Sequence, residues 1–472
     1  MKSFIGRKFE RNLLTSLVAK EQSEFIALYG RRRVGKTFLI KQFFDNKFSF
    51  YFSGIANSNT QKQLLSFNLA INNYANEPIE NAENWMVAFS QLIKYLEKST
   101  DKNKIVFIDE MPWLDTNGSD FMAAIDFFWN TWASGRNDVK LIVCGSAASW
   151  MINKLLNNKG GLHNRVTSRI KIEPFTLAEC EEYFKTKNYI FTRNQLIQLY
   201  MAMGGIPFYL EQVENGLSAV QNINKLCFTN TGLLRKEFDN LYASLFKKPE
   251  KYIAIIEAIA TKQKGLTREE IITISGMANG GTATKIIKEL EESNFIRKYT
   301  PFEKKTKNTL YQLVDFYSLF YLRFIKNSSD ADENFWLNAI DSPAIRAWSG
   351  YAYEQVCMWH LGSLKKALGI SGIQTRTSSW VSNRKENGAQ IDLLIDRADA
   401  VINICEIKFA NSDYIITKQY EKEIRNKIGV FTSETNTKKA VHFVMFTTFG
   451  LEQNSHALSV VQKDFGMDVL FE

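Results

Sequence analysis

The chain contains Gly30-Arg31-Arg32-Arg33-Val34-Gly35-Lys36-Thr37, which fits the spacing GxxxxGK(S/T). An apolar run at residues 25–29 precedes it and predicts a buried strand, and residues 38–44 follow with the spacing of a helix. In a strand–loop–helix unit of this kind, the loop amides and the helix N-terminus together bind phosphate. The segment therefore predicts a nucleoside triphosphate site, with Lys36 at the terminal phosphates and the Thr37 hydroxyl on magnesium.

An acidic pair ends another apolar run. Residues 104–108 predict a strand that leads into Asp109 and Glu110, as expected beside a phosphate loop. Hard cations prefer carboxylate and water oxygens, so we expect Asp109 to hold magnesium through water. Glu110 is then placed to polarise the attacking water, and an exposed acidic pair after an ordinary strand is the alternative. Further strands predicted at residues 48–52 and 140–144 indicate a parallel sheet with helices on both faces.

Three more residues are candidates for the same reaction. Ser146 follows the predicted strand at 140–144, where it can contact the terminal phosphate or the attacking water, and a simple turn is the competing interpretation. Arg165 or Arg169 can neutralise charge during phosphoryl transfer, in cis or from a neighbouring subunit of a homo-oligomer. Ordinary surface arginines are an equally simple interpretation of this pair.

The first half of the chain resembles a known group of ATPases. The resemblance is carried by FIGR at residues 4–7 with Glu10, the loop at 30–37, FIDE at 107–110, CGS at 144–146 and GGIP at 204–207. These segments are similar to the AAA+-related P-loop proteins called archaeal-type ATPases, which are close to the signal-transduction (STAND) ATPases. The resemblance implies ATP and Mg²⁺ as cofactors and places the segment around Arg7 in the adenine pocket.

A second set of polar residues lies near the C-terminus. Asp392 falls in the apolar segment 390–396, and Glu406 and Lys408 fall in the next one, 401–408. Alternate residues of a strand share a face, so Glu406 and Lys408 point the same way and Asp392 on the neighbouring strand can meet them. Glu354, in a segment expected to open a helix, can add a carboxylate. Such a cluster suits metal-assisted phosphodiester hydrolysis, with magnesium on Asp392 and Glu406 and water positioned by Lys408.

This block resembles the PD-(D/E)XK nuclease superfamily, and more narrowly the nuclease-like domain at the C-terminus of archaeal-type ATPases. Ile391 stands where the superfamily name has proline. A salt-bridged hairpin without catalytic activity is the alternative, because Glu and Lys often pair on one strand face.

Residues 250–326 have the order of a winged helix-turn-helix: helix, turn, helix and hairpin. The residues of the second helix expected in a DNA groove are Thr282, Thr284, Lys285 and Lys288. Lysines of the loop at 303–308 would contact phosphates as a wing tip. Glu289, Glu291 and Glu292 oppose DNA at the end of that helix, and a protein-contacting spacer is the alternative.

We expect an α/β multidomain protein, because 472 residues exceed one ordinary core. The expected parts are a P-loop parallel-sheet ATPase core at 1–155, a helical lid at 156–245, the winged helix at 250–326 and a restriction-endonuclease-like α/β domain at 335–472. The small polar residues 327–334 predict a linker before the last part.

Composition adds constraints on partners and compartment. A formal net charge of +9 suits a polyanion such as DNA. The five cysteines form no CxxC pair, which argues against a disulfide framework or zinc site, and the four histidines are expected to be structural or surface groups. No apolar run approaches the length of a signal core or membrane span, so a cytoplasmic protein without a membrane partner is expected.

These features favour a protein that binds and hydrolyses ATP and couples the cycle to DNA binding and metal-dependent DNA cleavage. The alternative is an ATP-dependent regulatory switch that binds DNA or a protein and cuts nothing. The complete set of Glu354, Asp392, Glu406 and Lys408 favours cleavage.

Overall fold

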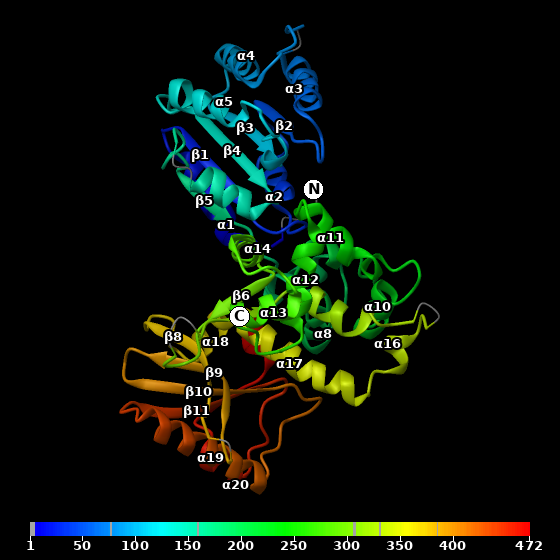
Figure 1. Ribbon diagram of the computed structural model, residues 1–472, viewed down its shortest axis with the longest axis vertical. Helices are drawn as coiled ribbons and strands as arrows, with labels where there is room; N and C mark the ends of the chain where they lie inside the picture. The colour runs from blue at the N-terminus through cyan, green and yellow to red at the C-terminus, as the bar shows by residue number, and fades with distance from the viewer. Residues whose placement is uncertain (1–4, 76–77, 158–159, 305–307, 330–331, 385) are drawn as a thin grey trace. The chain divides into compact units, whose positions relative to one another are not determined.

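The computed structural model describes residues 5–75, 78–157, 160–304, 308–329, 332–384 and 386–472 (Figure 1). The chain divides into two compact units, Met1–Pro174 and Phe175–Glu472. Some positions in the predicted motifs lie outside the described residues: Phe4, the wing-loop residues 305–307, and Asp330 and Ala331 of the expected linker.

The first unit is built on a five-stranded parallel sheet in the order β2-β3-β4-β1-β5. Its strands are β1 (Glu24–Tyr29), β2 (Phe50–Ser53), β3 (Lys104–Asp109), β4 (Val139–Gly145) and β5 (Ser168–Lys171). Successive side chains of β3 and β4 point to opposite faces, yet all of them are buried, so both faces of the sheet are covered. The predicted parallel α/β sheet is therefore confirmed.

The expected end of this core at residue 155 is too early. β5 pairs in parallel with β1, from Ile26 with Ser168 to Tyr29 with Lys171. This strand is short and polar, and only Ile170 is buried, as is common at a sheet edge. No apolar run marks it in the sequence, so the stretch from residue 156 was expected to be mostly helical.

Helices pack around the sheet (Figure 1). Aromatic side chains form much of the core between these helices and the sheet. The helical elements are α1 (Lys8–Ala19), α2 (Lys36–Phe43), α3 (Thr60–Ala75), α4 (Trp85–Lys98), η1 (Met111–Trp113), α5 (Phe121–Phe127), η2 (Phe128–Ala133), α6 (Ala148–Trp150) and η3 (Met151–Leu156). Phe67 of α3 packs against Phe52 of β2 and Trp85 of α4, with ring centroids 5.5 and 5.9 Å apart. Trp85 also meets Phe121 of α5 at 5.0 Å, so three helices join one face of the sheet.

The second unit begins with helices. They are α7 (Leu177–Thr186), α8 (Arg193–Met203), α9 (Pro207–Leu210), α10 (Ala219–Cys227), η4 (Leu233–Arg235) and α11 (Glu237–Leu245). A capping box starts α7, because the Thr176 side chain accepts from the Glu179 N–H and the Glu179 side chain accepts from the Thr176 N–H.

Residues 250–326 contain the expected element order. α12 (Pro249–Ala260) is followed by α13 (Arg268–Ser275), α14 (Gly281–Glu292), and the antiparallel pair β6 (Ile296–Tyr299) and β7 (Leu310–Leu313). A capping box of Thr267 and Glu270 starts α13. α15 (Phe316–Phe320) and η6 (Tyr321–Ile325) close this segment.

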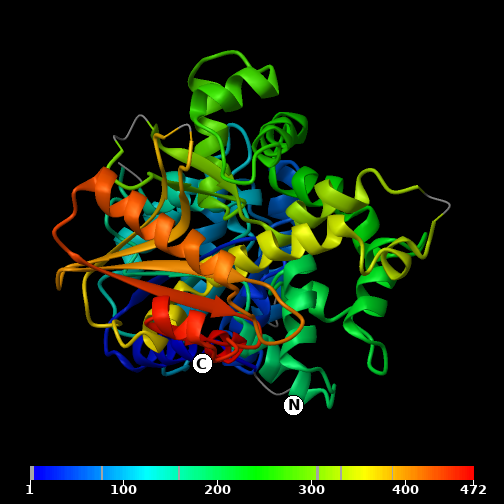
Figure 2. The same ribbon diagram turned by 90° about the horizontal axis from the view of Figure 1, so that it is seen from below.

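The C-terminal part is a second five-stranded sheet in the order β12-β11-β10-β9-β8. Its strands are β8 (Thr375–Val381), β9 (Gln390–Arg397), β10 (Val401–Lys408), β11 (Ala440–Thr447) and β12 (Lys463–Phe465). β8, β9 and β10 pair antiparallel, and β10, β11 and β12 pair parallel. The remaining helices are α16 (Phe335–Asn338), α17 (Pro343–Trp359), α18 (Leu361–Ala367), α19 (Lys418–Thr435), α20 (Ser455–Val460) and η7 (Met467–Phe471). In Figure 2 the orange helix α19 lies over this sheet, packed through its buried Ile424 and Phe431.

Residue 335 does not begin a separate domain. Trp336 of α16 and Trp348 of α17 form an aromatic cluster with Phe320, Phe324 and Phe228, which precede the expected linker. The polar stretch at 327–334 thus joins parts that pack together. α17 starts at Pro343, where the Ser342 hydroxyl accepts from the Ile345 N–H, so Glu354 lies inside a long helix rather than at its start.

No described helix has the length and apolarity that crossing a lipid bilayer requires.

His360 joins α17 to the start of α7. Its Nε2 accepts from the Leu177 N–H at 2.9 Å, and its Nδ1 donates to the Val356 carbonyl at 2.8 Å. Burial lowers the pKa of His360 to about 4. The ring is therefore neutral and structural near pH 7.

We expect His360 to make the second unit sensitive to acid. The pKa of the ring is 6.5 when unfolded and about 4 when folded, so its contribution is complete above pH 6.5 and is lost as the pH falls to 4. At about 1.4 kcal/mol per pKa unit, the loss approaches 3 kcal/mol. Urea unfolding followed by tryptophan fluorescence should show a flatter pH dependence for His360→Gln than for the wild type. An unchanged slope in His360→Gln contradicts this account.

Candidate functional site

The loop between β1 and α2 depends on two glycines. Gly30 has a φ of 146°, and a Cβ there would lie 2.3 Å from the Ile172 carbonyl oxygen. Gly35, with a φ of 90°, is the residue from which α2 starts. Larger residues strain such backbone, so both glycines of the motif are needed for the turn. The predicted strand–loop–helix context is present around residues 30–37.

Lys36 is folded over its own loop. Its Nζ donates to the carbonyls of Gly30 at 3.0 Å and Arg31 at 2.8 Å, and the side chain is only 5% exposed. The ammonium group also lies at the N-terminus of α2, where the helix dipole disfavours positive charge. A buried cation in this position favours an anionic ligand such as a triphosphate.

Thr37 and Asp109 are brought together from separate elements. The Thr37 hydroxyl donates to Asp109 Oδ2 at 2.8 Å, which joins α2 to the end of β3. Burial raises the pKa of Asp109, and the neighbouring Glu110 adds to the rise although the Thr37 hydrogen bond opposes it. A cation would stabilise this carboxylate, and a hydroxyl with a carboxylate is a donor set that fits Mg²⁺.

Glu110 and Ser146 form a second contact across adjacent strands. The Ser146 N–H donates to Glu110 Oε2 at 3.2 Å, and the Ser146 hydroxyl bonds the other carboxylate oxygen. Glu110 has a φ of 47°, a left-handed conformation that a glutamate rarely adopts. Such strain is often found at functional sites, and here it turns the carboxylate toward the end of β4.

The arginines predicted for this site differ in their surroundings. Arg7 is buried and donates to the Val34 carbonyl at 3.0 Å, so it supports the loop directly. Arg31 is buried, Arg32 is exposed, and Arg33 has a left-handed φ of 69°. Arg165 is exposed, while Arg169 on β5 donates to the Leu156 carbonyl at 2.9 Å.

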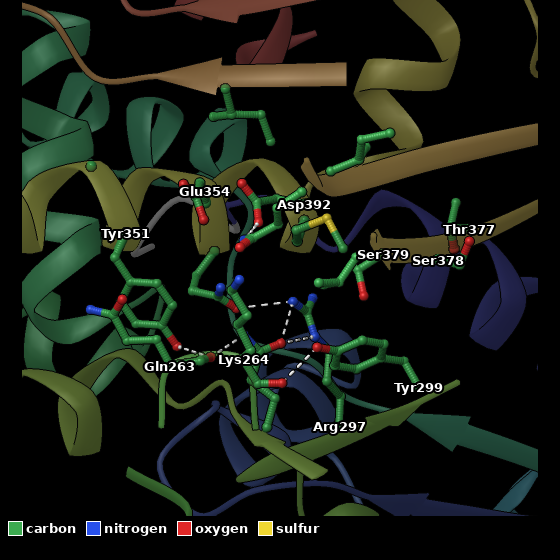
Figure 3. Close-up of a pocket in the computed structure, with 18 of the residues that line it drawn as sticks. Gln263, Lys264, Arg297, Tyr299, Tyr351, Glu354, Thr377, Ser378, Ser379 and Asp392 are labelled. Carbon is green, nitrogen blue, oxygen red and sulfur yellow. Dashed lines mark hydrogen bonds between the residues drawn. The ribbon is translucent and has the colours of Figure 1, made fainter. Parts of the chain in front are cut away.

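The second unit contains a cavity of about 580 Å³ (Figure 3). Glu354 of α17, Asp392 of β9 and Lys408 of β10 line it, so three of the four predicted residues meet at one place. Glu406 is buried beside them, and Lys408 Nζ lies 2.9 Å from its Oε1. Tyr420 donates to the same oxygen at 2.9 Å, and Lys427 bonds Oε2.

The pKa values of Glu354 and Glu406 are shifted in opposite directions. Burial raises the pKa of Glu354 to about 8, with Asp392 and Glu406 adding to the rise and Lys408 opposing it. Burial also tends to raise the pKa of Glu406, but Lys427 and Lys408 outweigh it and the pKa is lowered. At neutral pH, Glu354 is therefore mostly protonated, and Glu406 is an ionised carboxylate held by two lysines.

The predicted metal ligands do not form a preassembled metal centre. Among the described residues, no three His, Cys, Asp or Glu side chains are grouped closely enough to hold a metal ion. Asp392 is exposed and accepts from the Gln390 side chain, while Glu406 is held by lysines. Asp392 and Glu406 are ligands of the right type, but a metal would have to compete with these partners.

Two partners of Glu406 were not predicted from the sequence. Tyr420 and Lys427 lie seven residues apart on α19, with the buried Ile424 between them. That spacing is two helical turns, so both side chains share the face that packs on the sheet. The spacing was visible in the sequence, but its relation to Glu406 depends on packing between distant segments.

Comparisons with known proteins relate the part of the chain that holds the loop at residues 30–37 to ATPases. Residues 4–213 match a family described as an ATPase domain predominantly from Archaea. The chain is 29% identical over 401 residues to an uncharacterized protein of Methanocaldococcus jannaschii, covering 83% of this chain and 84% of that protein. An uncharacterized ATP-binding protein of the same organism is 50% identical over 44 residues, covering 9% of this chain and 75% of its own length.

A solved structure shares the fold. The Walker-type ATPase PABY2304 of Pyrococcus abyssi has a TM-score of 0.50 at 18% identity, covering 68% of this chain and 96% of its own. Residues 4–213 are thus similar to an ATPase domain found predominantly in Archaea, and the chain shares a fold with this Walker-type ATPase.

Glu354 gives a testable dependence of stability on pH. Its pKa is 4.5 when unfolded and about 8 when folded, so stability falls as the pH rises through this window. Glu354→Gln cannot ionise and should be more stable than the wild type, by a margin that widens by up to about 4 kcal/mol between pH 5 and 8. Urea unfolding at both pH values measures the margin, and the exposed Glu452→Gln is the control. A margin that is constant or shrinks with pH would refute the assignment.

Proposed function

We propose that the protein hydrolyses ATP at the loop of residues 30–37. The observation that supports this most is the Thr37–Asp109 hydrogen bond, because it places a hydroxyl and a buried carboxylate beside Lys36. In this proposal the loop amides and Lys36 bind the β- and γ-phosphates, and Thr37 and Asp109 hold Mg²⁺. The metal supplies charge neutralisation for the phosphates when it is bound.

Glu110 and Ser146 then act on water. Glu110 accepts a hydrogen bond from the attacking water and aligns it with the γ-phosphorus. Ser146 holds the Glu110 carboxylate through two hydrogen bonds, which fixes the direction in which it accepts. Arg165, exposed in the first unit, remains a candidate for neutralising charge in cis or from a neighbouring subunit.

Two substitutions separate binding from hydrolysis. Lys36→Ala should abolish tight ATP binding, since the loop loses its ammonium group. Glu110→Gln should bind ATP as the wild type does but hydrolyse it about 100-fold more slowly or worse, because water is no longer activated. Phosphate release and equilibrium binding measure the two effects, and the exposed Lys47→Ala is the matched control. Full turnover in Glu110→Gln would remove Glu110 from the mechanism.

DNA is the proposed macromolecular partner. Thr282, Thr284, Lys285 and Lys288 are all exposed on α14. Lys285 and Lys288 pair with Glu289 at 3.9 Å and Glu292 at 3.5 Å. The two lysine side chains are 74% and 59% exposed, so their ammonium groups lie at the surface where DNA phosphates can reach them, whereas the two carboxylates are each only 12% exposed.

The second proposed activity is metal-dependent cleavage of DNA by the C-terminal region. It is favoured by one observation, the meeting of Glu354, Asp392 and Lys408 in one cavity. Asp392 and Glu406 would hold the metal, and Lys408 would position water. The alternative, a switch that binds without cutting, is favoured by the lysines that already balance the charge of Glu406.

DNA incubation with Mg²⁺ or Mn²⁺ and ATP decides between these two. If the region cleaves, Lys408→Ala should reduce cutting about 100-fold while ATP turnover persists, since general acid–base groups typically contribute this much. Lys463→Ala, an exposed lysine of β12, should cut normally. Wild-type protein that leaves single- and double-stranded DNA intact with both metals establishes the non-cleaving switch instead.

A further inference from the structure

The Glu406 cluster contains a second lysine that the proposed cleavage does not use. The Nζ of Lys427, on α19, bonds Glu406 Oε2, whereas Lys408 Nζ lies 2.9 Å from Oε1. Among the described residues that line the cavity, Lys408 is present and Lys427 is not. Lys427 is therefore placed to act on the Glu406 carboxylate, and not on a ligand inside the cavity.

The packing of α19 fixes this contact. The helix is anchored on the C-terminal sheet by the buried side chains of Ile424 and Phe431, which flank Lys427 in the sequence. The Lys427 and Glu406 side chains are only 19% and 9% exposed. Tyr420, two helical turns before Lys427, donates to Glu406 Oε1 at 2.9 Å. The pair is thus largely buried and hydrogen-bonded, unlike the exposed ion pairs of a protein surface.

Lys427 changes the sum of charges in the cluster. The pairing of β9 with β10 ends one residue short of Asp392 and Glu406, so these carboxylates lie at matching positions on neighbouring strands. With Lys408 alone, the two carboxylates would keep one net negative charge, which a divalent cation would offset. Lys427 supplies a positive charge from the chain itself, and the cluster is balanced without a metal ion.

The opposite wall of the cavity adds a further cation. Figure 3 shows Glu354 and Asp392 on one side of the cavity and Arg297 on the other. Arg297 donates to amide oxygens, Gln312 Oε1 at 2.7 and 2.9 Å and Gln355 Oε1 at 3.1 Å, which do not neutralise its charge. Burial raises the pKa of Glu354 to about 8, so this acid offsets little of that charge near pH 7. A divalent cation would therefore meet positive charge that is already present.

We propose that the Lys427 ammonium group takes the place of a divalent cation at Glu406 and excludes metal from the cluster. The inference rests on the proposed function only in taking Asp392 and Glu406 as the metal ligands, and it favours the switch that does not cut. Magnesium is commonly held by one or two carboxylates together with water. Removal of the one ammonium group should therefore convert the cluster into a metal site.

A titration with Mn²⁺ alone tests the proposal. The full chain is titrated without nucleotide, and free Mn²⁺ is followed by electron paramagnetic resonance. We expect Lys427→Met to bind one more Mn²⁺ per chain than the wild type, whose affinity at Glu406 should be at least about tenfold lower, because Lys427 competes for the carboxylate. The same Mn²⁺ binding in the wild type and in folded Lys427→Met overturns the proposal.

Two control variants assign the additional ion. Lys427→Met combined with Glu406→Gln should lose it, since the Mn²⁺ ligand is gone while the loop at residues 30–37 is unchanged. Lys422→Met, which replaces an exposed lysine of the same helix, should bind Mn²⁺ as the wild type does. Retention of the ion after Glu406→Gln, or its appearance in Lys422→Met, contradicts the role of Lys427.

Thermal unfolding verifies that the variant is folded. A cooperative transition and unaltered ATP binding identify folded Lys427→Met, and Mn²⁺ should raise its melting temperature more than that of the wild type, because a ligand stabilises the state that binds it. If Lys427→Met does not fold, Lys427→Gln replaces it with the same expectation. An equal shift in wild type and folded variant counts against the proposal.

The cleavage assay separates this inference from the cleavage proposal. Metal-dependent cutting by the wild type that Glu406→Gln abolishes overturns the inference and keeps cleavage. Uptake of the additional Mn²⁺ by Lys427→Met, with DNA left intact by the wild type, keeps the inference and removes cleavage.

Discussion

The hydrogen bond from Thr37 to Asp109 connects the start of α2 with the end of β3, and the nucleotide site depends on that connection. The hydrogen bond holds the Asp109 carboxylate, whose pKa is raised by burial. It also brings this carboxylate close to the buried Lys36 ammonium group, which lies at the positive end of α2. Each of these charges is costly to bury in the folded chain. A triphosphate with a divalent cation compensates both, which is why the arrangement is better explained by ligand binding than by stability.

The second unit also contains ionisable groups whose charge is costly to bury. Glu354 is buried with its pKa raised to about 8, while Arg297 on the opposite wall is held by glutamine amides. Glu406 is paired with two lysines, Lys408 and Lys427, and Lys408 also lines the cavity. The lining of this cavity thus combines the cations Arg297 and Lys408 with the carboxyl groups of Glu354 and Asp392.

Much of the first site could be predicted from the sequence because its parts are local. The loop at 30–37 and the pair at 109–110 each follow an apolar run, and the strands of a parallel sheet align their carboxyl ends. β5 was missed because a short polar edge strand leaves no apolar run. Ser342-Pro343, a cap with proline at the first helical position, marked the true start of α17. Arg297 and Lys427 were not found, since their roles arise from packing between segments far apart in sequence.

Calorimetric titration of ATP into the purified chain, with Mg²⁺ and again with EDTA, tests the central claim most directly. The account predicts one nucleotide per chain and an affinity at least about tenfold higher with the metal, because Thr37 and Asp109 bind the nucleotide through it. Absence of binding, or the same affinity in EDTA, would contradict it.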